Sequence, residues 1–228
     1  MKIGVLGTGM VGQVIVPKMV ALGHHVFMGT RDADSTRNRT EPERTTGVSF
    51  VDWFSAHSGF QLVSYADIPS ETDLFINASH GETSIEALES VGKDKLAGKI
   101  ILDLANALDF SKGMPPTMLV CNNDSLGEQI QRTFPHAFVV KSLNTMNCTI
   151  MMDPSRVQGD HNVFMSGNDS ASKHIVKILL ESIGWSSANI IDLGDITTSR
   201  GTEMMLPVWI RLWDALGTPE FNFHIARN

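Results

Sequence analysis

The sequence has few of the features that mark secreted, membrane or metal-dependent proteins. Its two cysteines, Cys121 and Cys148, are too few for a disulfide framework, and no histidines are spaced with them as a zinc ligand set. No apolar run approaches the roughly 18 residues that span a bilayer, and the first residues lack the basic and apolar segments of a secretory signal. We therefore expect a cytoplasmic protein without a metal site or a membrane partner.

Basic residues are fewer than acidic ones, which further limits the classes of protein to which the chain can belong. The 228 residues include 18 Lys and Arg against 25 Asp and Glu, giving a formal net charge of −7, and 42% of them are hydrophobic. An acidic balance argues against nucleic acid as the main partner. The length and hydrophobic content suit a globular protein with a substantial core. We expect an enzyme or a small-molecule binder.

Short apolar runs alternate with amphipathic stretches, a pattern typical of a parallel α/β sheet. Strands are predicted over residues 2–6, 25–28, 61–64, 74–78, 99–104, 137–141, 163–166 and 190–193. Helices are predicted over residues 10–22, 84–91, 125–134, 170–183 and 199–216. The polar residues 30–46 are predicted to form a long loop, and Pro17 to kink the first helix.

These elements predict a single domain over residues 1–228. The fold class expected is α/β, with one Rossmann-type doubly wound sheet that is mostly parallel. Its core would occupy residues 1–166. Residues 167–228 would add a short extension of helices and strands.

Residues 7–12 read Gly-Thr-Gly-Met-Val-Gly and satisfy the pattern G-x-G-x-x-G between a predicted strand and a predicted helix. Gly7 permits the tight turn, Gly9 lets a pyrophosphate approach the backbone, and Gly12 lets the helix pack on the strand. Amides at the start of the helix favour phosphate charge. The alternative is a glycine turn without a ligand. We expect a dinucleotide at Gly7, Thr8, Gly9, Met10, Val11 and Gly12.

The end of the second predicted strand indicates which dinucleotide is bound. NAD sites usually carry Asp or Glu about 20 residues after the glycines, whereas this chain has Thr30 and Arg31. A hydroxyl and a guanidinium suit a 2′-phosphate, because Arg offers forked, charged donors. Arg37 and Arg39 could add positive charge to this site. The nearby Asp32, a carboxylate of the kind that NAD sites use, leaves NAD as the alternative cofactor. We expect NADP.

The chain resembles the reductases that pass hydride between NADP and the deazaflavin coenzyme F420. The resemblance begins with the glycine motif and Gly-Thr-Arg at 29–31. It continues through Ser-Leu-Asn-Thr-Met at 142–146, Ser-Gly-Asn-Asp at 166–169, Leu-Gly-Asp at 193–195 and Glu-Phe-Asn-Phe at 220–223. Because these segments occur in the family's order, the resemblance covers nearly the whole chain.

The resemblance implies roles for residues beyond the glycine motif. Ala78, Ser79, Ala105, Asn106, Asn144 and Cys148 would border the nicotinamide half of the cofactor. Thr30 and Arg31 would hold the 2′-phosphate. The family's further basic residue falls near Ser35 here, which leaves Arg37 as a substitute, and Asn144 stands where archaeal members carry His. The differences from the family's pattern fall mostly among residues that would contact the hydride acceptor. The resemblance therefore implies the cofactor NADP more firmly than the identity of the acceptor.

The apolar residues 204–213 are unusual for a terminal helix. Helical spacing places Trp209 and Trp213 on one face, which fits either the core or a homodimer interface. The alternative is a wall for a tricyclic ring, with Met146, Met205, Trp209 and Phe221 as the candidate acceptor pocket. The sparse charge on this helix favours a homodimer.

We interpret the chain as an NADP-dependent oxidoreductase that exchanges hydride with coenzyme F420 or a flavin. Such a transfer needs no protein acid, since the cofactors supply the reactivity. An alternative is the reduction of a small carbonyl or imine compound, which needs a proton donor. His80, after the fourth predicted strand, is the weak candidate for that catalytic role. A non-catalytic NADP(H) sensor also fits the sequence.

Overall fold

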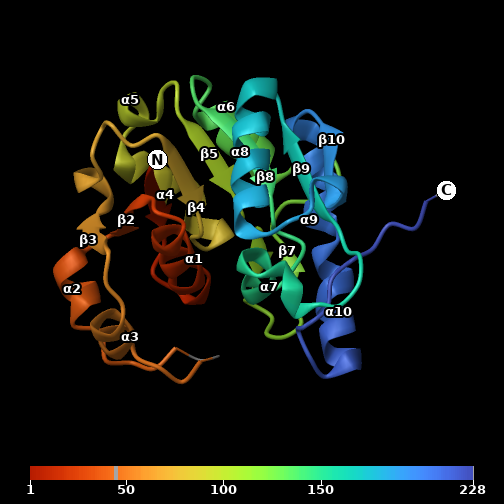
Figure 1. Ribbon diagram of the computed structural model, residues 1–228, viewed down its shortest axis with the longest axis horizontal. Coiled ribbons are helices and arrows are strands. Elements are labelled where there is room, and N and C mark those ends of the chain that lie inside the picture. The colour runs from red at the N-terminus through yellow and green to blue at the C-terminus, as the bar shows by residue number, and fades with distance from the viewer. Residues whose placement is uncertain (44–45, 228) are drawn as a thin grey trace.

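The computed structural model describes residues 1–43 and 46–227, which fold around an eight-stranded sheet (Figure 1). In spatial order the strands are β10 (Ile190–Gly194), β9 (Val163–Gly167), β8 (Phe138–Ser142), β5 (Ile100–Asp103), β4 (Leu74–Asn77), β1 (Lys2–Leu6), β2 (His25–Thr30) and β3 (Phe60–Ser64). Neighbouring strands are parallel except β8 and β9, which pair antiparallel. The sheet starts in its middle and winds to both sides, so the predicted mostly parallel, doubly wound α/β class is confirmed.

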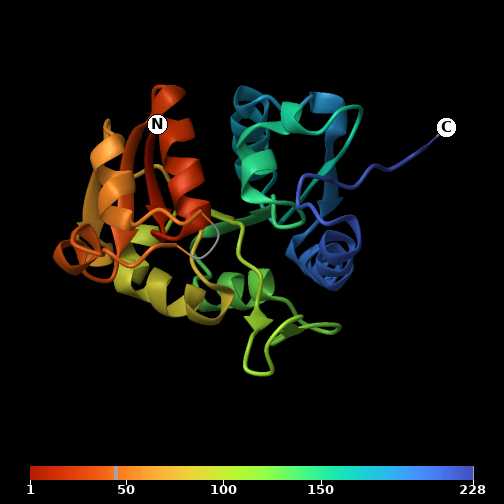
Figure 2. The ribbon, with the colours of Figure 1, turned by 90° about the horizontal axis from the view of Figure 1, so that it is seen from below.

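Helices cover both faces of the sheet, as the colours in Figure 2 show. One layer contains α1 (Met10–Ala21), α3 (Phe50–Ala56), α7 (Cys148–Met152) and α8 (Ser170–Ile183), and these helices share one apolar cluster. The other contains α4 (Ser84–Val91), α5 (Lys93–Leu96) and α6 (Leu126–Thr133), which share a second cluster. Strands buried on both faces explain why the sequence runs are almost continuously apolar.

The predicted strands are all present, and their ends differ from the predicted ends by two residues at most. The helices predicted over 84–91 and 170–183 have those bounds. The single helix predicted over 199–216 is wrong, because it divides into α9 (Ser199–Met204) and α10 (Leu206–Leu216). Pro207, in the first turn of α10, has no N–H to bond the carbonyl of Glu203, so the hydrogen-bond ladder breaks there.

The long loop predicted over 30–46 is also wrong in part. It contains α2 (Ala33–Arg37), whose N-cap Asp32 accepts a hydrogen bond from the Ser35 amide at 3.0 Å. Residues 44 and 45 of that predicted loop lie outside the described residues. The sequence also gave no sign of α3, α5 and α7, or of the hairpin β6 (Leu108–Asp109) and β7 (Thr117–Met118). The described residues also contain short 3-10 helices: η1 (Tyr65–Asp67), η2 (Gly81–Thr83), η3 (Pro154–Arg156), η4 (Ser187–Asn189) and η5 (Ile196–Thr198).

The chain beyond residue 167 contributes to the same sheet and then forms the terminal helices. β10 pairs with β9, and α9 and α10 follow. The tail then returns to the start of β9, where the Asn162 amide donates to the Phe223 carbonyl at 2.8 Å and the Ile225 amide donates to Asn162 Oδ1 at 2.7 Å. Over residues 1–43 and 46–227, no helix is both long and apolar enough to cross a membrane.

Candidate functional site

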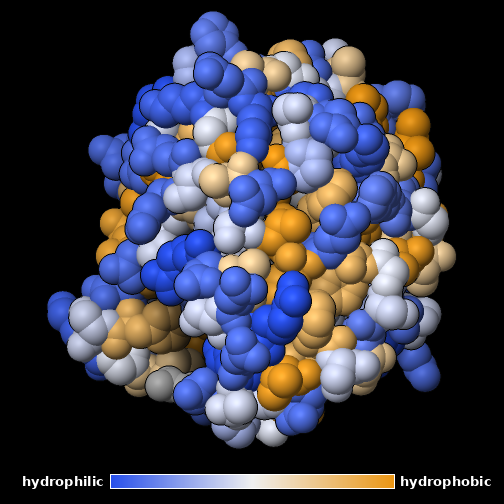
Figure 3. All heavy atoms as spheres, turned by 90° about the vertical axis from the view of Figure 1, so that its left-hand side faces the viewer, coloured by the Kyte–Doolittle hydropathy of each residue, from blue (hydrophilic) through white to orange (hydrophobic). Residues whose placement is uncertain are grey.

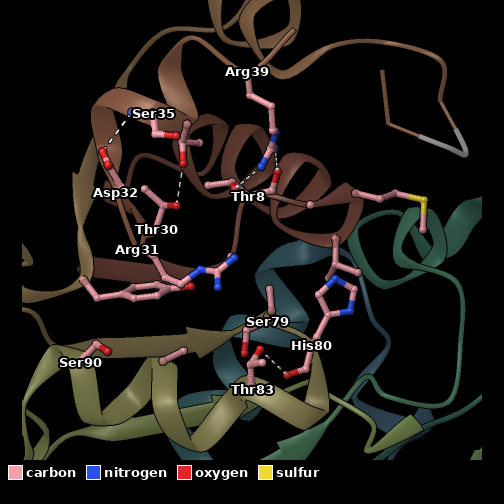
Figure 4. A pocket seen from close by; sticks show the side chains of 18 of the residues that line it. Thr8, Thr30, Arg31, Asp32, Ser35, Arg39, Ser79, His80, Thr83 and Ser90 are labelled. Atoms are coloured by element: carbon pink, nitrogen blue, oxygen red, sulfur yellow. Dashed lines mark hydrogen bonds between the residues drawn. The ribbon is translucent and has the colours of Figure 1, made fainter. Parts of the chain in front are cut away.

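A cavity of about 980 Å³ lies where β1, β2 and β4 end. β1 and β4 are the adjacent strands from which the chain winds in opposite directions, the usual ligand site of such sheets. Its walls also include one side each of α2 and α4, and Figure 4 shows side chains from these elements facing one space. The sequence-predicted residues that line it are Gly7, Thr8, Gly9, Met10, Val11, Thr30, Arg31, Ala78, Ser79 and His80.

The backbone requires glycine at two of the three motif positions, Gly7 and Gly12, whereas Gly9 leaves room for a ligand. Gly7 has a φ of 122°, and a Cβ there would lie 2.5 Å from the Ala78 carbonyl oxygen. A Cβ on Gly12 would lie 2.1 Å from the Gly7 carbonyl oxygen, so Gly12 packs the helix on the turn and does not line the cavity. A Cβ on Gly9 would meet no atom of residues 1–43 or 46–227 within 4 Å. Gly9 therefore leaves open space beside the backbone, on the cavity side.

The N-terminus of α1 opens onto this space, and the first residues of the helix place no acidic group there. Its N-cap is Gly9, which offers no side-chain hydrogen bond, and its first turn contains no acidic residue. The helix dipole and the unpaired first amides therefore favour an anion at this end. Together with the room beside Gly9, this arrangement fits the pyrophosphate of a dinucleotide.

The end of β2 supplies a cation beside that anion site. Arg31 is exposed, lines the cavity and makes no hydrogen bond or ion pair with the described part of the chain. Thr30 is buried, and its hydroxyl shares a 2.8 Å hydrogen bond with that of Thr36. Asp32 also lines the cavity, but one of its carboxylate oxygens caps α2. A free guanidinium beside an engaged carboxylate suits a 2′-phosphate better than a ribose hydroxyl.

Of the other described arginines in residues 31–43, Arg39 reaches the cavity and Arg37 does not. Arg37 is exposed at the end of α2, with its guanidinium 5.7 Å from the centre of the Phe54 ring. Arg39 donates to the Thr8 carbonyl at 2.8 Å and to the Thr8 hydroxyl at 3.3 Å, over the Phe50 ring. Ser35 lines the cavity as well. The sequence interpretation favoured Arg37 because it stands near Ser35, where the family has its further basic residue, and it did not detect α2.

The residues expected around the nicotinamide fall into two groups. Ala78 and Ser79 line the cavity, whereas Ala105, Asn106, Asn144 and Cys148 do not. The structure joins Asn106 and Asn144, because Asn106 Nδ2 donates to the Asn144 carbonyl at 2.8 Å and Asn144 Nδ2 donates to Asn106 Oδ1 at 3.0 Å. This pair bridges the ends of β5 and β8.

Cys148 and His80 differ in their exposure. Cys148 is buried, and burial raises the pKa of its thiol to about 11, so the group stays neutral near pH 7. His80 is exposed at the N-cap of η2 and lines the cavity, where Figure 4 shows its ring. His80 is therefore the better placed of the two to meet a ligand.

The four residues expected to bind the acceptor do not all belong to one apolar cluster. Trp209 stacks on Phe221, with ring centres 5.4 Å apart, and its indole nitrogen is buried without a hydrogen-bond partner among the described residues. Met146 is buried in the apolar cluster that contains α1 and α8, apart from the cluster of Trp209. Met205 lies at the joint between α9 and α10.

The sequence profile of the family "NADP oxidoreductase coenzyme F420-dependent" matches residues 2–107, which contain the lining of the cavity. A crystal structure from Arthrobacter sp. FB24, of a protein named as a candidate F420-dependent NADP reductase, is 54% identical in sequence. The match covers 100% of both chains with a TM-score of 0.93. The chain belongs to this F420-dependent family.

Two curated relatives are more distant. The F420-dependent NADP reductase of Methanocaldococcus jannaschii is 26% identical over 147 residues, which are 64% of this chain and 64% of the relative. The metalloreductase STEAP3 of Rattus norvegicus is 24% identical over 212 residues, or 91% of this chain and 38% of the relative. The chain thus spans less than two thirds of either relative. Membership of the F420-dependent family agrees with the resemblance recognised in the sequence.

Proposed function

We propose that the chain binds NADP in the 980 Å³ cavity and catalyses hydride transfer between NADP(H) and coenzyme F420. The observation that carries the proposal is the start of α1 beside Gly9, which no side chain caps, with Arg31 on the same cavity and without a partner among the described residues. The names of the Arthrobacter and Methanocaldococcus relatives support F420 as the acceptor. None of the three relatives is named for a flavin, the other acceptor that the sequence allowed.

The residues that would hold the cofactor can be grouped by the part of the cofactor that they would contact. The backbone of Thr8, Gly9, Met10 and Val11 would bind the pyrophosphate, and Thr30 and Arg31 the 2′-phosphate. Arg39 fixes the turn by holding the Thr8 carbonyl at 2.8 Å. Ala78 and Ser79, with the Asn106–Asn144 pair further along the strand ends, would border the nicotinamide.

The bound cofactors supply the redox chemistry, so the chain's task is to bind, orient and exclude water. The neutral, buried thiol of Cys148 fits this task because it adds no charge and no acid near the strand ends. No strong proton donor is needed for transfer between two ring carriers. A site of this kind uses shape and burial rather than acid catalysis.

A second candidate function rests on His80, whose exposed ring lines the same cavity. There it could donate a proton during reduction of a small ketone or imine. The two functions are separated by following the absorbance of NADPH with purified protein and coenzyme F420, FMN, FAD, or a panel of ketones and imines. Turnover with F420 alone supports the first proposal. Turnover with ketones or imines that His80→Asn lowers roughly 100-fold would replace it with the second.

We also propose that the chain forms a homodimer through α10 and the β6–β7 hairpin. Val208, Trp213 and Leu216 of α10 are exposed by 54%, 39% and 56%, and Met114 of the hairpin by 66%. Met114, Trp213 and Ile210 line a second cavity of about 520 Å³ between these elements. On the face over β3 and α2, by contrast, hydrophilic and hydrophobic residues are intermixed (Figure 3). A second copy would cover the apolar side chains of α10.

A further inference from the structure

Lys141, in β8, is a fully buried cation with three acceptors. Its ammonium donates to Asp103 Oδ2 at 2.8 Å, to the Ala105 carbonyl, and to Glu203 Oε1 at 2.9 Å. Its side chain and that of Asp103 are both 0% exposed. Every ammonium proton therefore has a protein partner.

One side of this cluster reaches the cavity. Asp103 Oδ1 accepts from the Ala105 amide at 3.1 Å and from Asn77 Nδ2 at 2.8 Å. Asn77 Oδ1 in turn accepts from the hydroxyl of Ser79 at 2.6 Å, and Ser79 lines the cavity. The ends of β4 and β5, where the nicotinamide would lie, are thus tied to Lys141.

The other side of the cluster reaches the terminal helices. Glu203 belongs to α9 and accepts from the first amides of α6, those of Leu126 and Gly127, at 2.8 and 3.0 Å. α10, which carries Trp209, begins three residues after Glu203. Lys141 therefore connects the strand ends beside the cavity to the start of the terminal segment, which carries Met205, Trp209 and Phe221 of the expected acceptor residues.

The charge on Lys141 is maintained by its surroundings. Burial alone would lower the pKa of the ammonium, but Asp103 and Glu203 beside it raise that pKa above its ordinary value. Buried ion pairs often contribute little net stability, because desolvation offsets their attraction. A gain in folding stability therefore explains the presence of this cluster poorly. The positions in which the cluster holds β5, β8 and α9 explain it better.

We propose that Lys141 is a positioning residue: through Ala105 and Glu203 it fixes the separation between the nicotinamide side of the cavity and α9–α10. The inference rests on the proposed function, in which two rings must meet with reacting atoms about 3–3.5 Å apart. A displacement of roughly 1 Å can lower such a rate about 100-fold. Loss of the link should thus lower the rate of hydride transfer more than cofactor affinity.

The test compares two substitutions in the same pair of helices. Lys141→Met would leave two buried carboxylates without their cation and risks not folding, so Glu203→Gln is the main variant and leaves the Lys141–Asp103 pair intact. Glu128→Gln is the matched control. Glu128 of α6 binds Arg200 of α9 at 2.8 and 2.6 Å, and neither residue bonds to β5.

Amide hydrogen exchange, NADPH titration and turnover with coenzyme F420 are measured on all three proteins. For Glu203→Gln we expect faster exchange over residues 103–108, an NADPH Kd within about 3-fold of the original, and a kcat lowered about 10-fold or more. For Glu128→Gln we expect changes in exchange only in α6 and α9. Equal behaviour of the two variants, or an NADPH Kd that rises as much as kcat falls, would overturn the proposal. If the unaltered protein shows no turnover with F420, the proposed function fails, while the exchange at 103–108 still decides whether the link exists.

Discussion

Among the described residues, Arg31 and Arg39 are the arginines that reach the cavity, and their contacts assign them different roles. Arg39 is engaged with the carbonyl and hydroxyl of Thr8 and lies over Phe50. Arg31 has no such partner in the described chain, so its guanidinium can turn fully toward a ligand. Arg39 thus belongs to the structure of the glycine turn, and Arg31 to the choice between NADP and NAD.

Arg31→Ala should weaken NADPH binding by about 1–3 kcal/mol, the cost of a lost charged hydrogen bond, and change NADH binding little. The dissociation constants of both cofactors can be measured by fluorescence titration. Arg37→Ala is the matched control, because Arg37 lies near Phe54 and outside the cavity. Equal losses of NADPH and NADH affinity in Arg31→Ala would remove the 2′-phosphate assignment.

The two cysteines should react at very different rates. Burial raises the pKa of the Cys148 thiol to about 11, whereas Cys121 is exposed. Because the thiolate is the reactive form, iodoacetamide near pH 8 should label Cys121 alone in the folded protein. Mass spectrometry of Cys121→Ser should then show almost no labelling until denaturant is added. Rapid labelling of Cys148 in that variant would contradict its burial.

Sequence patterns predicted the long elements well and the short ones poorly. Strands buried on both faces give apolar runs that are easy to recognise, and α8 has both a capping Asp169 and a closing Gly184. α2 and α7 have five residues each, too few to show helical periodicity. The sequence named Arg37 and Arg39 together, and without α2 it offered no way to tell that Arg39 lines the cavity and Arg37 does not. The break between α9 and α10 depends on Pro207, whose effect the apolar pattern concealed.

At the scale of a single helix, the N-cap of α2 can be tested for its effect on stability and on cofactor binding. Asp32→Ala removes the carboxylate that accepts from the Ser35 amide at 3.0 Å, and losing such a cap costs about 1 kcal/mol. The amide of Arg39 bonds the Thr36 carbonyl of this helix at 3.1 Å, so a loosened α2 should also release Arg39 from Thr8. We expect a Tm lower by about 2–4 °C and weaker NADPH binding. Asp32→Asn keeps a capping side chain and should change both less; equal effects of the two variants would argue against capping.

At the scale of the whole molecule, the sheet brings together residues that the sequence keeps far apart. The glycine turn and the end of β2 could be assigned to one site because the Rossmann pattern is local and recurrent. The link from Asp103 through Lys141 to Glu203 spans 100 positions of the sequence, and no spacing rule predicts it. The acceptor pocket was the least predictable part, because Met146 and Trp209 belong to different apolar clusters.

The proposed homodimer predicts a specific effect of charge on α10. Val208 is exposed by 54%, and Val208→Asp would place a carboxylate in an interface built on Trp213 and Leu216, where an unpaired charge is costly to bury. Ile178 of α8 is exposed by 52% on another helix, which makes Ile178→Asp the matched control. Light scattering coupled to size-exclusion chromatography should give a dimer for the original protein and for Ile178→Asp, and a monomer for Val208→Asp. A monomeric original protein would refute the dimer, whereas dissociation by Ile178→Asp alone would move the interface from α10 to α8.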